Sequence, residues 1–535
     1  MGFFSSGGGA LLPAQILAGQ RREAAKLREE LGESLASVQE FDTPLNQVTT
    51  SSLDALKALS LGWKAKDERG PAAALPFYQR AIELDPNFAF AYVALGVQYN
   101  NLGQTVRARE YIIKVFALRA RTSEWEKLDI AGVYYETVTR ELAKACDVWQ
   151  EMIANFPRDG LPYSHLSEDR MMEGDYAAGV ELSRQGLRLD PNSEAYYENQ
   201  GADLMALGRL DEARKTFEEA LSHKLDYPDM HMDLYSLAFL AGDIQDMAKQ
   251  AAWFEGKPGR HEIFWGEADT EAYGGKLGRA RELTRRAVEE AVRADNPEAA
   301  APWREDAALR EAAFGNAAEA RREAEAGRRL APDNRDAEAQ AAVGYAWSGD
   351  EGGARRLASQ LKKQFPLDTL VNDYWLPTID ARTELAKNDP AAAVDLLQAI
   401  SSPLELGMPI GLVDIACLYP VYTRGEAYLA ARQGSAAAGE FQKILRHAGI
   451  VQNCATAALE RLGLARAYAL EAGRGGTTVR AVKNHGSHPG ETPVPQQAAL
   501  AKARAAYQDF FTLWKDADPD IPILKQAKGE FAKLK

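Results

Sequence analysis

The residues of this chain that could do metal chemistry are few and poorly grouped. His485 and His488 form an H-x-x-H pair, but a metal site needs about three or four converging ligands. His261 and Glu262 begin like H-E-x-x-H, yet the fifth residue is Trp265, which breaks the zinc-protease pattern. We therefore expect no bound metal and no cofactor.

The three cysteines, Cys146, Cys417 and Cys454, are far apart and include no C-x-x-C pair. Disulfide frameworks usually show an even number of cysteines, and metal sites usually show close pairs. A scattered, odd set is typical of buried thiols in a reducing compartment. We therefore expect free cysteines and a cytoplasmic location.

The sequence lacks the motifs that mark common catalytic sites. It has neither the G-x-S-x-G turn of serine hydrolases nor a glycine-rich loop followed by Lys and Ser or Thr. Neighbouring carboxylates are frequent, but on helices they are more often solvated surface than a catalytic pair. We expect the protein not to be an enzyme.

Two basic clusters repeat the same arrangement. Each has two adjacent basic residues followed by two more: Arg321-Arg322 with Arg328-Arg329, and Arg355-Arg356 with Lys362-Lys363. Glutamates alternate with the arginines of the first cluster, as on a solvated helix face. We interpret both clusters as outer helix surface, with a patch for an anionic partner as the alternative.

Composition excludes several classes of protein. Hydrophobic residues make up 46% of the 535 residues, too many for a disordered chain, and the length exceeds one compact core. The net charge of −14 opposes binding to phosphate backbones, so we expect no nucleic-acid partner. No apolar run approaches the roughly 18 residues that a membrane span needs, so we expect no span in this chain.

The strongest pattern is an internal repeat of 34 residues. It relates these positions: Leu61 and Leu95, Pro157 and Pro191, and Pro332 and Pro366. Strand signals are nearly absent, because Ala, Glu, Leu and Arg dominate the chain. A fixed period of this length in a helical chain indicates a stack of similar helical units.

Small and large residues alternate at helical spacing inside one period. Gly96 is followed by Gly103, Ala108 and Ile112, and the same offsets recur after Gly201. Small residues at Gly96 and Ala108 allow two helices to cross closely, and a glycine between the helices suits a positive φ. One such pair cannot bury its apolar face alone, so neighbouring pairs must stack on it.

These residues resemble the tetratricopeptide repeat family over roughly residues 53 to 520. The resemblance implies an all-α, right-handed superhelical solenoid of about twelve antiparallel helix pairs. It also implies a non-enzymatic scaffold or adaptor that binds a protein or peptide partner in its concave groove.

In that family the first helix of each pair lines the groove, which gives a set of candidate binding residues. The candidates are Phe90, Val93, Val97, Asn100, Glu198, Ala202, Met205, Met232, Ser236, Phe239, Tyr422 and Glu426. Their methionine and aromatic side chains suit peptide capture. The face near Leu59 and Trp63 is apolar, so a clamp for a partner's terminal carboxylate is not expected.

A second resemblance is to the repeat regions of certain bacterial serine/threonine protein kinases. It is carried by the runs 31–35, 41–45, 49–53, 123–128 and 511–518. The phosphate loop, H-R-D and D-F-G motifs of a kinase domain are absent. This resemblance implies, as the alternative function, a regulatory or sensor module of a kinase signalling system. It implies an extracytoplasmic location if the chain follows a membrane span.

The chain is expected to have five parts. Residues 1–17 are a Gly- and Ser-rich mobile N-terminus, and residues 18–52 form a helix and a linker. Residues 53–470 are the repeats. Residues 471–498 are rich in Gly, Pro, Thr and His, which predicts a flexible insertion. Residues 499–535 form the last repeat helix and a C-terminal cap.

Overall fold

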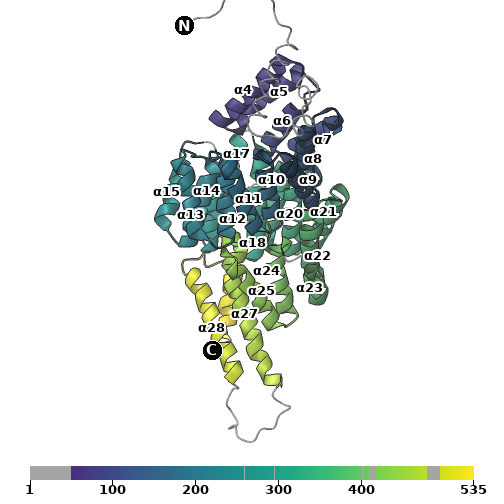
Figure 1. The fold of residues 1–535 in the computed structure, drawn as a ribbon. Helices are drawn as coiled ribbons and strands as arrows, with labels where there is room; N and C mark the ends of the chain where they lie inside the picture. Colours follow the sequence, from purple (N-terminus) through teal and green to yellow (C-terminus); the bar gives the residue numbers. More distant parts are fainter. Residues whose placement is uncertain are drawn as a thin grey trace, which may run out of the picture. The chain divides into compact units, whose positions relative to one another are not determined.

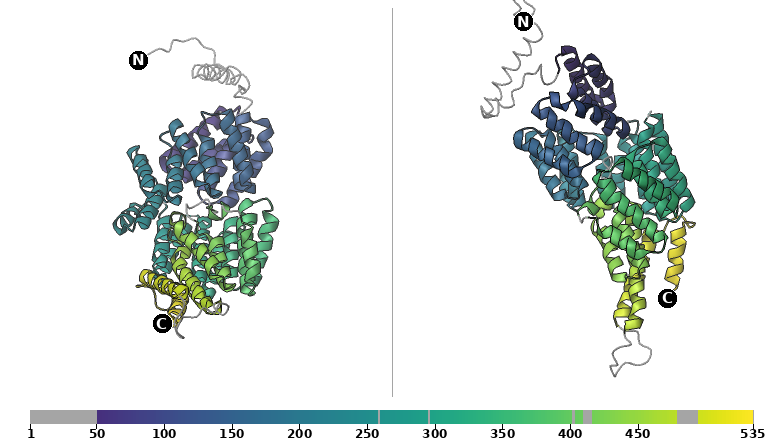
Figure 2. Two further views of the ribbon diagram at one scale, coloured as in Figure 1. Left: turned by 60° about the horizontal axis from the view of Figure 1, so that its bottom comes forward. Right: turned by 90° about the vertical axis from the view of Figure 1, so that its right-hand side faces the viewer.

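The computed structural model describes residues 50–257, 259–294, 296–400, 403–408, 416–478 and 494–534, and every regular element among them is helical. The chain divides into two compact units, with unit 1 ending at Pro162 and unit 2 beginning at Tyr163. Figure 1 labels the helices and Figure 2 shows them from two other sides. Among the described helices, none is long and apolar enough to cross a membrane.

Unit 1 contains three antiparallel helix pairs. They are α4 (Leu53–Arg69) with α5 (Pro71–Leu84), α6 (Ala89–Asn101) with α7 (Thr105–Leu118), and α8 (Glu124–Tyr134) with α9 (Leu142–Asn155). A short 3₁₀ turn, η1 (Arg119–Arg121), follows α7, and a π-helical turn, η2 (Tyr135–Thr139), follows α8.

Unit 2 continues the pairing to the end of the chain. Its helices are α10 (Leu161–Met172), α11 (Tyr176–Leu189), α12 (Glu194–Ala206), α13 (Leu210–Ser222), α14 (Pro228–Ala241), α15 (Ile244–Trp253), α16 (Arg260–Tyr273), α17 (Leu277–Arg293), α18 (Pro297–Ala313), α19 (Ala317–Leu330), α20 (Arg335–Trp347), α21 (Glu351–Gln364), α22 (Leu376–Ala386), α23 (Pro390–Gln398), α24 (Tyr419–Ala430), α25 (Gly434–Arg446), α26 (Ala448–Val451), α27 (Ala455–Thr478), α28 (Val494–Leu513) and α29 (Pro522–Ala532). The turns η3 (Val371–Trp375) and η4 (Leu404–Leu406) lie between them. With α26 and α29 set aside, the described helices form twelve successive pairs, which confirms the predicted all-α repeat.

The helices of a pair cross closely because their first helix carries a small residue at the crossing. A Cβ atom at Gly96 would overlap Ile112, and one at Gly201 would overlap the ring of Phe217. Between the helices Gly103 has φ +73°, a conformation that glycine adopts without strain. The spacing of small and large residues in the sequence therefore sets the geometry of each pair.

The D-P-N sequence that recurs in the chain forms the same turn each time. The carboxylate of Asp85 accepts a hydrogen bond of 3.0 Å from the backbone of Asn87, and that of Asp190 accepts one of 3.0 Å from Asn192. Each aspartate directly follows a helix, α5 or α11. The proline that comes next has no N–H with which to continue the helix, so each pair ends at this turn.

The predicted insertion at 471–498 is shorter than the sequence indicates. Helix α27 continues to Thr478 and α28 begins at Val494, so only residues 479–493, which include His485 and His488, lie outside the described residues. The helices extend this far because α27 and α28 pack along each other. The predicted N-terminal parts, 1–17 and most of 18–52, also lie outside the described residues.

Unit 2 folds back on itself, so that distant segments share one core. The backbone of Met408 donates to the carbonyl of Met171 at 3.3 Å. The indole of Trp514 donates to the carbonyl of Tyr273 at 3.0 Å. One hydrophobic cluster extends from Met171 to Ala527. The late helices of unit 2 are therefore packed on the early ones.

Cys417 and Cys454 form a disulfide, with Cα atoms 5.5 Å apart. The prediction of free cysteines is therefore wrong for these two, and holds only for Cys146, which is buried and belongs to no disulfide. The error has a physical origin: the segment before α24 returns to the start of α27, where Thr456 donates to the carbonyl of Cys417 at 2.6 Å. A separation of 37 residues in the sequence gave no sign of this return.

The interior of unit 2 also contains charged groups. The guanidinium of Arg310 donates to the carboxylate of Asp269 at 2.5 Å and to the hydroxyl of Thr284 at 2.8 Å, and it is buried. Glu460 is buried on α27, where burial raises its pKa to about 7 although Arg461 partly opposes the shift. A raised folded-state pKa means that deprotonation of Glu460 destabilises the folded chain.

We expect loss of the disulfide to lower the stability of unit 2. Cys454→Ser, or reduction of the wild type, releases the loop that separates Cys417 from Cys454 by 37 residues. Closing a loop of this length restricts the unfolded chain by roughly 4 kcal/mol in the chain-entropy model. Thermal unfolding should therefore occur at lower temperature in the reduced protein. Cys146→Ser, which removes the buried thiol outside the bridge, is the control, and an equal loss of stability in that variant would contradict the role of the bridge.

We expect Glu460→Gln to stabilise the chain at high pH and to change little at low pH. The folded pKa of about 7 lies above that of the unfolded chain. The associated stability is therefore fully present only below the unfolded pKa of about 4.5, falls as the pH rises from there, and is lost by about pH 7. At pH 8.5 the variant should gain roughly 3 kcal/mol in the free energy of unfolding relative to wild type.

Denaturant unfolding at several pH values checks this expectation. The pKa of Glu262 is also raised, to about 8, but both proteins carry it and its effect cancels in the comparison. Glu218→Gln, at an exposed carboxylate of α13, is the matched control. A constant difference between Glu460→Gln and wild type across pH would contradict the assignment.

Candidate functional site

Three aromatic side chains form a row across the first helices of unit 1. Trp63 lies on α4, Phe90 on α6 and Trp125 on α8, and we call them the aromatic row. The ring centroids of Trp63 and Phe90 are 5.8 Å apart and those of Phe90 and Trp125 are 5.5 Å apart, both edge to face. Trp63 is 42% exposed, and the other two are partly exposed. The row offers an apolar surface that solvent reaches.

The start of α8 holds Trp125 in place. Ser123 and Glu126 form a capping box, in which the backbone of each residue donates to the side chain of the other at 3.1 Å. The indole N–H of Trp125 donates to the carboxylate of Asp159, which follows α9. Burial raises the pKa of Glu126. The capping box fixes the backbone on either side of Trp125, and the bond to Asp159 fixes its indole. The Trp125 ring therefore has a fixed orientation in the row.

The predicted groove residues of α6 are only partly available. Phe90, Val97 and Asn100 are partly exposed, whereas Val93 is buried. Helix α6 packs against α5, α7 and α8, so part of its surface faces these neighbours and not solvent. The structure therefore corrects the placement of Val93 and leaves the other three at the surface.

Three predicted groove residues of unit 2 are buried by the chain itself. Ala202, Met205 and Tyr422 are at most 2% exposed. Gly449 of α26 lies directly on the carbonyl of Met205, where a Cβ atom would overlap it. The prediction that these side chains line an open groove is wrong. In α12, the face that was predicted to line the groove is covered by α26, from the late part of unit 2.

The segment between α26 and α27 also makes polar contacts with another first helix, α16. The side-chain amide of Asn453 donates to the carbonyl of Gly266 and to the hydroxyl of Thr270, both at 3.0 Å. The hydroxyl of Tyr235, on α14, donates to Thr270 at 3.0 Å. A segment from the late part of unit 2 is thus hydrogen-bonded to α16, and Tyr235 of α14 joins the same group of contacts.

The remaining predicted residues of unit 2 are half-buried. They are Glu198, Met232, Ser236, Phe239 and Glu426. The ring of Phe239 packs edge to face on Tyr273, with centroids 5.1 Å apart. The carboxylate of Glu426 accepts from Arg382 at 2.5 Å.

The positive charge of Arg382 is balanced by contacts within unit 2. Its guanidinium lies 3.6 Å from the centroid of the Trp347 ring and donates to Glu426 and, at 2.9 Å, to the hydroxyl of Thr423. Both the cation and its partners come from α20, α22 and α24 of the same unit. The Nη2 atom of Arg382 is buried and has no hydrogen-bond partner among the described residues.

Among residues 50–534 with their undescribed gaps set aside, no group of three His, Cys, Asp or Glu side chains is arranged to hold a metal ion. His261 and Glu262 lie together at the start of α16, where burial lowers the pKa of His261 to about 4.

Sequence reasoning missed most of the aromatic row. It recognised Phe90, treated Trp63 only as part of an apolar face and did not single out Trp125. The three residues do not occupy equivalent places in their helices: Phe90 and Trp125 lie near helix starts and Trp63 lies late in α4. The available signal was the presence of at least one aromatic residue on each of three successive first helices.

Comparison with known proteins agrees with the paired-helix repeat. Residues 77–110 match the family model described as tetratricopeptide repeat, a range that contains the four predicted groove residues of α6. The match covers one repeat length of the chain. It does not test the resemblance to kinase repeat regions, which stays a prediction.

Several solved structures are similar to parts of this chain. PilW, a widely conserved type IV pilus biogenesis factor, is 14% identical with a TM-score of 0.30, covering 40% of this chain and 97% of that chain. A thermophilic TPR protein in Thermus thermophilus is 18% identical with a TM-score of 0.25, covering 39% and 94%. A tetratricopeptide repeat protein from Parabacteroides merdae is 15% identical with a TM-score of 0.26, covering 60% and 98%.

Proposed function

We propose that this chain is a non-enzymatic binding scaffold whose unit 1 captures an apolar segment of a partner protein on the aromatic row. The observation that carries the proposal is the contrast between the two units. The first helices of unit 1 keep a row of partly exposed aromatic rings. In unit 2, by contrast, Gly449 packs on the first helix α12 at Met205 and Asn453 is hydrogen-bonded to the first helix α16.

The spacing of the row suits an extended peptide. Every second side chain of an extended strand lies about 6.6 Å from the last, close to the 5.8 and 5.5 Å between the ring centroids. Apolar side chains at alternate positions can therefore contact successive rings. Tryptophan at the centre of such a contact commonly supplies much of the binding free energy, because its large rigid ring loses little conformational entropy on binding.

We infer that the protein acts in an oxidising compartment. The support is the disulfide between Cys417 and Cys454, because such bonds form and persist outside the reducing cytosol. This proposal replaces the cytoplasmic location expected from the sequence. Mass spectrometry of alkylated, non-reduced protein from its native source tests it, and free thiols at both positions would contradict it.

We expect Trp63→Ala to weaken peptide binding by at least tenfold, which corresponds to about 1.4 kcal/mol. Peptides are first selected on wild-type protein from a displayed random library, and their affinities are then measured by calorimetry. Trp63 is partly exposed, so its removal should leave thermal unfolding nearly unchanged. Trp125→Ala should act in the same direction.

Ile113→Ala is the matched control. Ile113 is an apolar side chain of unit 1 that is 49% exposed, but it lies on α7, a second helix. Its removal should not change affinity. Selected peptides that bind equally well to wild type and to Trp63→Ala, or that bind only through unit 2, would show that the aromatic row is not the site.

A further inference from the structure

The two basic clusters lie on two successive second helices. The first cluster lies on α19 and the second on α21, and their residues are 34 positions apart in the sequence. We call these eight residues the basic face: Arg321, Arg322, Arg328, Arg329, Arg355, Arg356, Lys362 and Lys363. Seven of them are exposed and Arg328 is half-buried. The face is a local concentration of positive charge in a chain of net charge −14.

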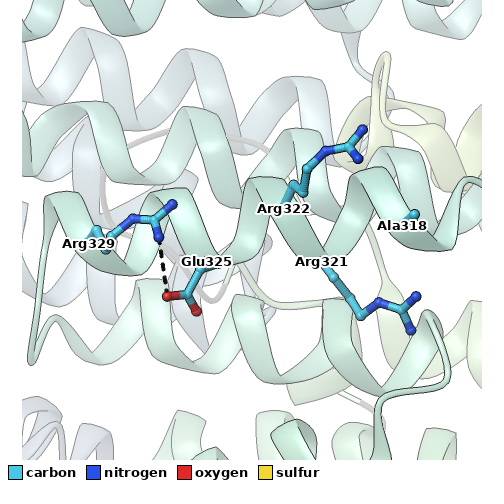
Figure 3. Close-up of a pocket in the computed structure, with 5 residues that line it drawn as sticks. All are labelled: Ala318, Arg321, Arg322, Glu325 and Arg329. Carbon is cyan, nitrogen blue, oxygen red and sulfur yellow. Dashed lines mark hydrogen bonds and ion pairs between the residues drawn. The ribbon is translucent and has the colours of Figure 1, made fainter.

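Part of the basic face borders a shallow hollow on α19. Figure 3 shows this hollow, lined by Ala318, Arg321, Arg322, Glu325 and Arg329. Arg329 donates to Glu325 at 3.4 Å and Arg321 donates to the carbonyl of Ser348 at 3.3 Å. The hollow therefore has a small apolar residue beside guanidinium groups that reach solvent.

The cations of α21 are less neutralised than those of α19. Arg355 pairs with Glu351 at 3.0 Å. Arg356, Lys362 and Lys363 form no ion pair within 4.0 Å among the residues that the structure describes. Burial raises the pKa of Asp380, and Lys362 acts to lower it.

The neighbouring second helix α17 shows the ordinary arrangement for comparison. Exposed arginines of this helix form ion pairs with carboxylates: Arg279 pairs with Glu282 at 2.6 Å and Arg285 with Glu289 at 2.5 Å on the same helix, and Arg281 pairs with Glu311 of α18 at 2.7 Å. Pairs of this kind leave little net charge for a partner. The open cations of α21 are thus a distinctive feature of this part of unit 2.

Another second helix of unit 2 carries the complementary charges at the same spacing. Helix α13 has two adjacent carboxylates followed by two more, which we call the acidic face: Asp211, Glu212, Glu218 and Glu219. All four are exposed. Glu212 pairs with Arg209 at 2.6 Å. Asp211, Glu218 and Glu219 form no ion pair within 4.0 Å in the described part of the chain.

The two faces match in length as well as in charge. In each helix the second doublet follows the first by seven residues, which is two turns and about 10.5 Å along the axis. Four carboxylates of α13 can therefore face four cations of α21 or of α19. In Figure 1, α13 and α21 lie on opposite sides of unit 2, so one chain cannot make this contact within itself.

We propose that the protein associates with a second copy of itself, with the acidic face of one copy docked on the basic face of the next. The two surfaces are different, so the contact is head to tail. Such a contact leaves one free face at each end and extends into a chain of copies unless the rotation closes a ring.

The discrete spacing favours a protein helix over a phosphate polymer. Duplex DNA carries a negative charge about every 1.7 Å along its axis, and its phosphates would also meet Glu325, which lies among the cations of α19. Carboxylates seven residues apart on a helix can reach the cations without this conflict. The charge pattern of α13 is such a helix within the same chain.

Sedimentation velocity on the full chain tests the proposal. We expect the average sedimentation coefficient to rise with protein concentration at about 20 mM salt and to fall back to the monomer value at about 500 mM, because ions screen exposed charge pairs. A wild type that stays monomeric up to about 200 µM in low salt would overturn the proposal, since electrostatic contact between exposed faces is strongest there.

Charge reversal distinguishes the two faces. Arg356→Glu with Lys362→Glu and Lys363→Glu should abolish self-association, and so should Asp211→Lys with Glu218→Lys and Glu219→Lys. An equimolar mixture of these two variants should associate again, because each retains the face that the other has lost. Failure of the mixture to associate, or association of either variant alone at the wild-type level, would overturn the proposal.

A third variant separates the local face from the overall charge. Lys515→Glu with Lys525→Glu and Lys528→Glu changes the net charge as much as the α21 variant, at exposed lysines of unit 2 outside the basic face. It should associate like wild type. The same sedimentation runs with an added fluorescent oligoglutamate peptide, a single-stranded oligonucleotide or vesicles containing phosphatidylserine test other occupants. Binding of any of these to α21 by a wild type that does not self-associate would assign the basic face to that partner and reject the second copy.

Discussion

The close crossing of the two helices in each pair is the constraint on which the rest of this structure depends. Gly96 and Gly201 leave room for Ile112 and Phe217, and this contact fixes how the second helix lies on the first. A pair held in this way exposes apolar side chains on its flanks. Stacking of the next pair covers them, so the same small residue that shapes one pair also propagates the array within each unit.

The sequence was sufficient to predict this array, because its period reports contacts between neighbours. The D-P-N turns, the crossing glycines and the twelve pairs all follow from residues within one or two repeats of each other. The packing of the late helices of unit 2 on its early helices does not follow from such short-range contacts. The hydrogen bond from Asn453 to Gly266 joins residues 187 positions apart, and the disulfide joins Cys417 and Cys454. Neither contact has any counterpart in a repeating pattern, so sequence periodicity could not indicate them.

Of the candidate site, too, only the features that depend on local sequence could be predicted. Family resemblance indicated the first helices, and Phe90 on one of them is partly exposed. It could not indicate that Met205 and Tyr422 are covered, because burial there depends on the long-range return of α26 and α27. Nor did it find Trp125, whose ring meets Phe90 from the start of the next first helix, α8. Which part of a groove stays open is a property of the tertiary fold, whereas the existence of a groove-forming helix is a property of the local sequence.

The closure of unit 2 has a mechanical consequence. An open stack of helix pairs behaves like a spring, because each pair can rotate slightly on the next and small rotations add up along the axis. In unit 2 the bonds from Met408 to Met171 and from Trp514 to Tyr273 tie the late turns to the early ones, and the disulfide closes a further loop. Rotation at one joint would have to break these ties, so the small movements cannot accumulate. These ties therefore oppose, within unit 2, the rotation between neighbouring pairs that makes an open helical repeat elastic.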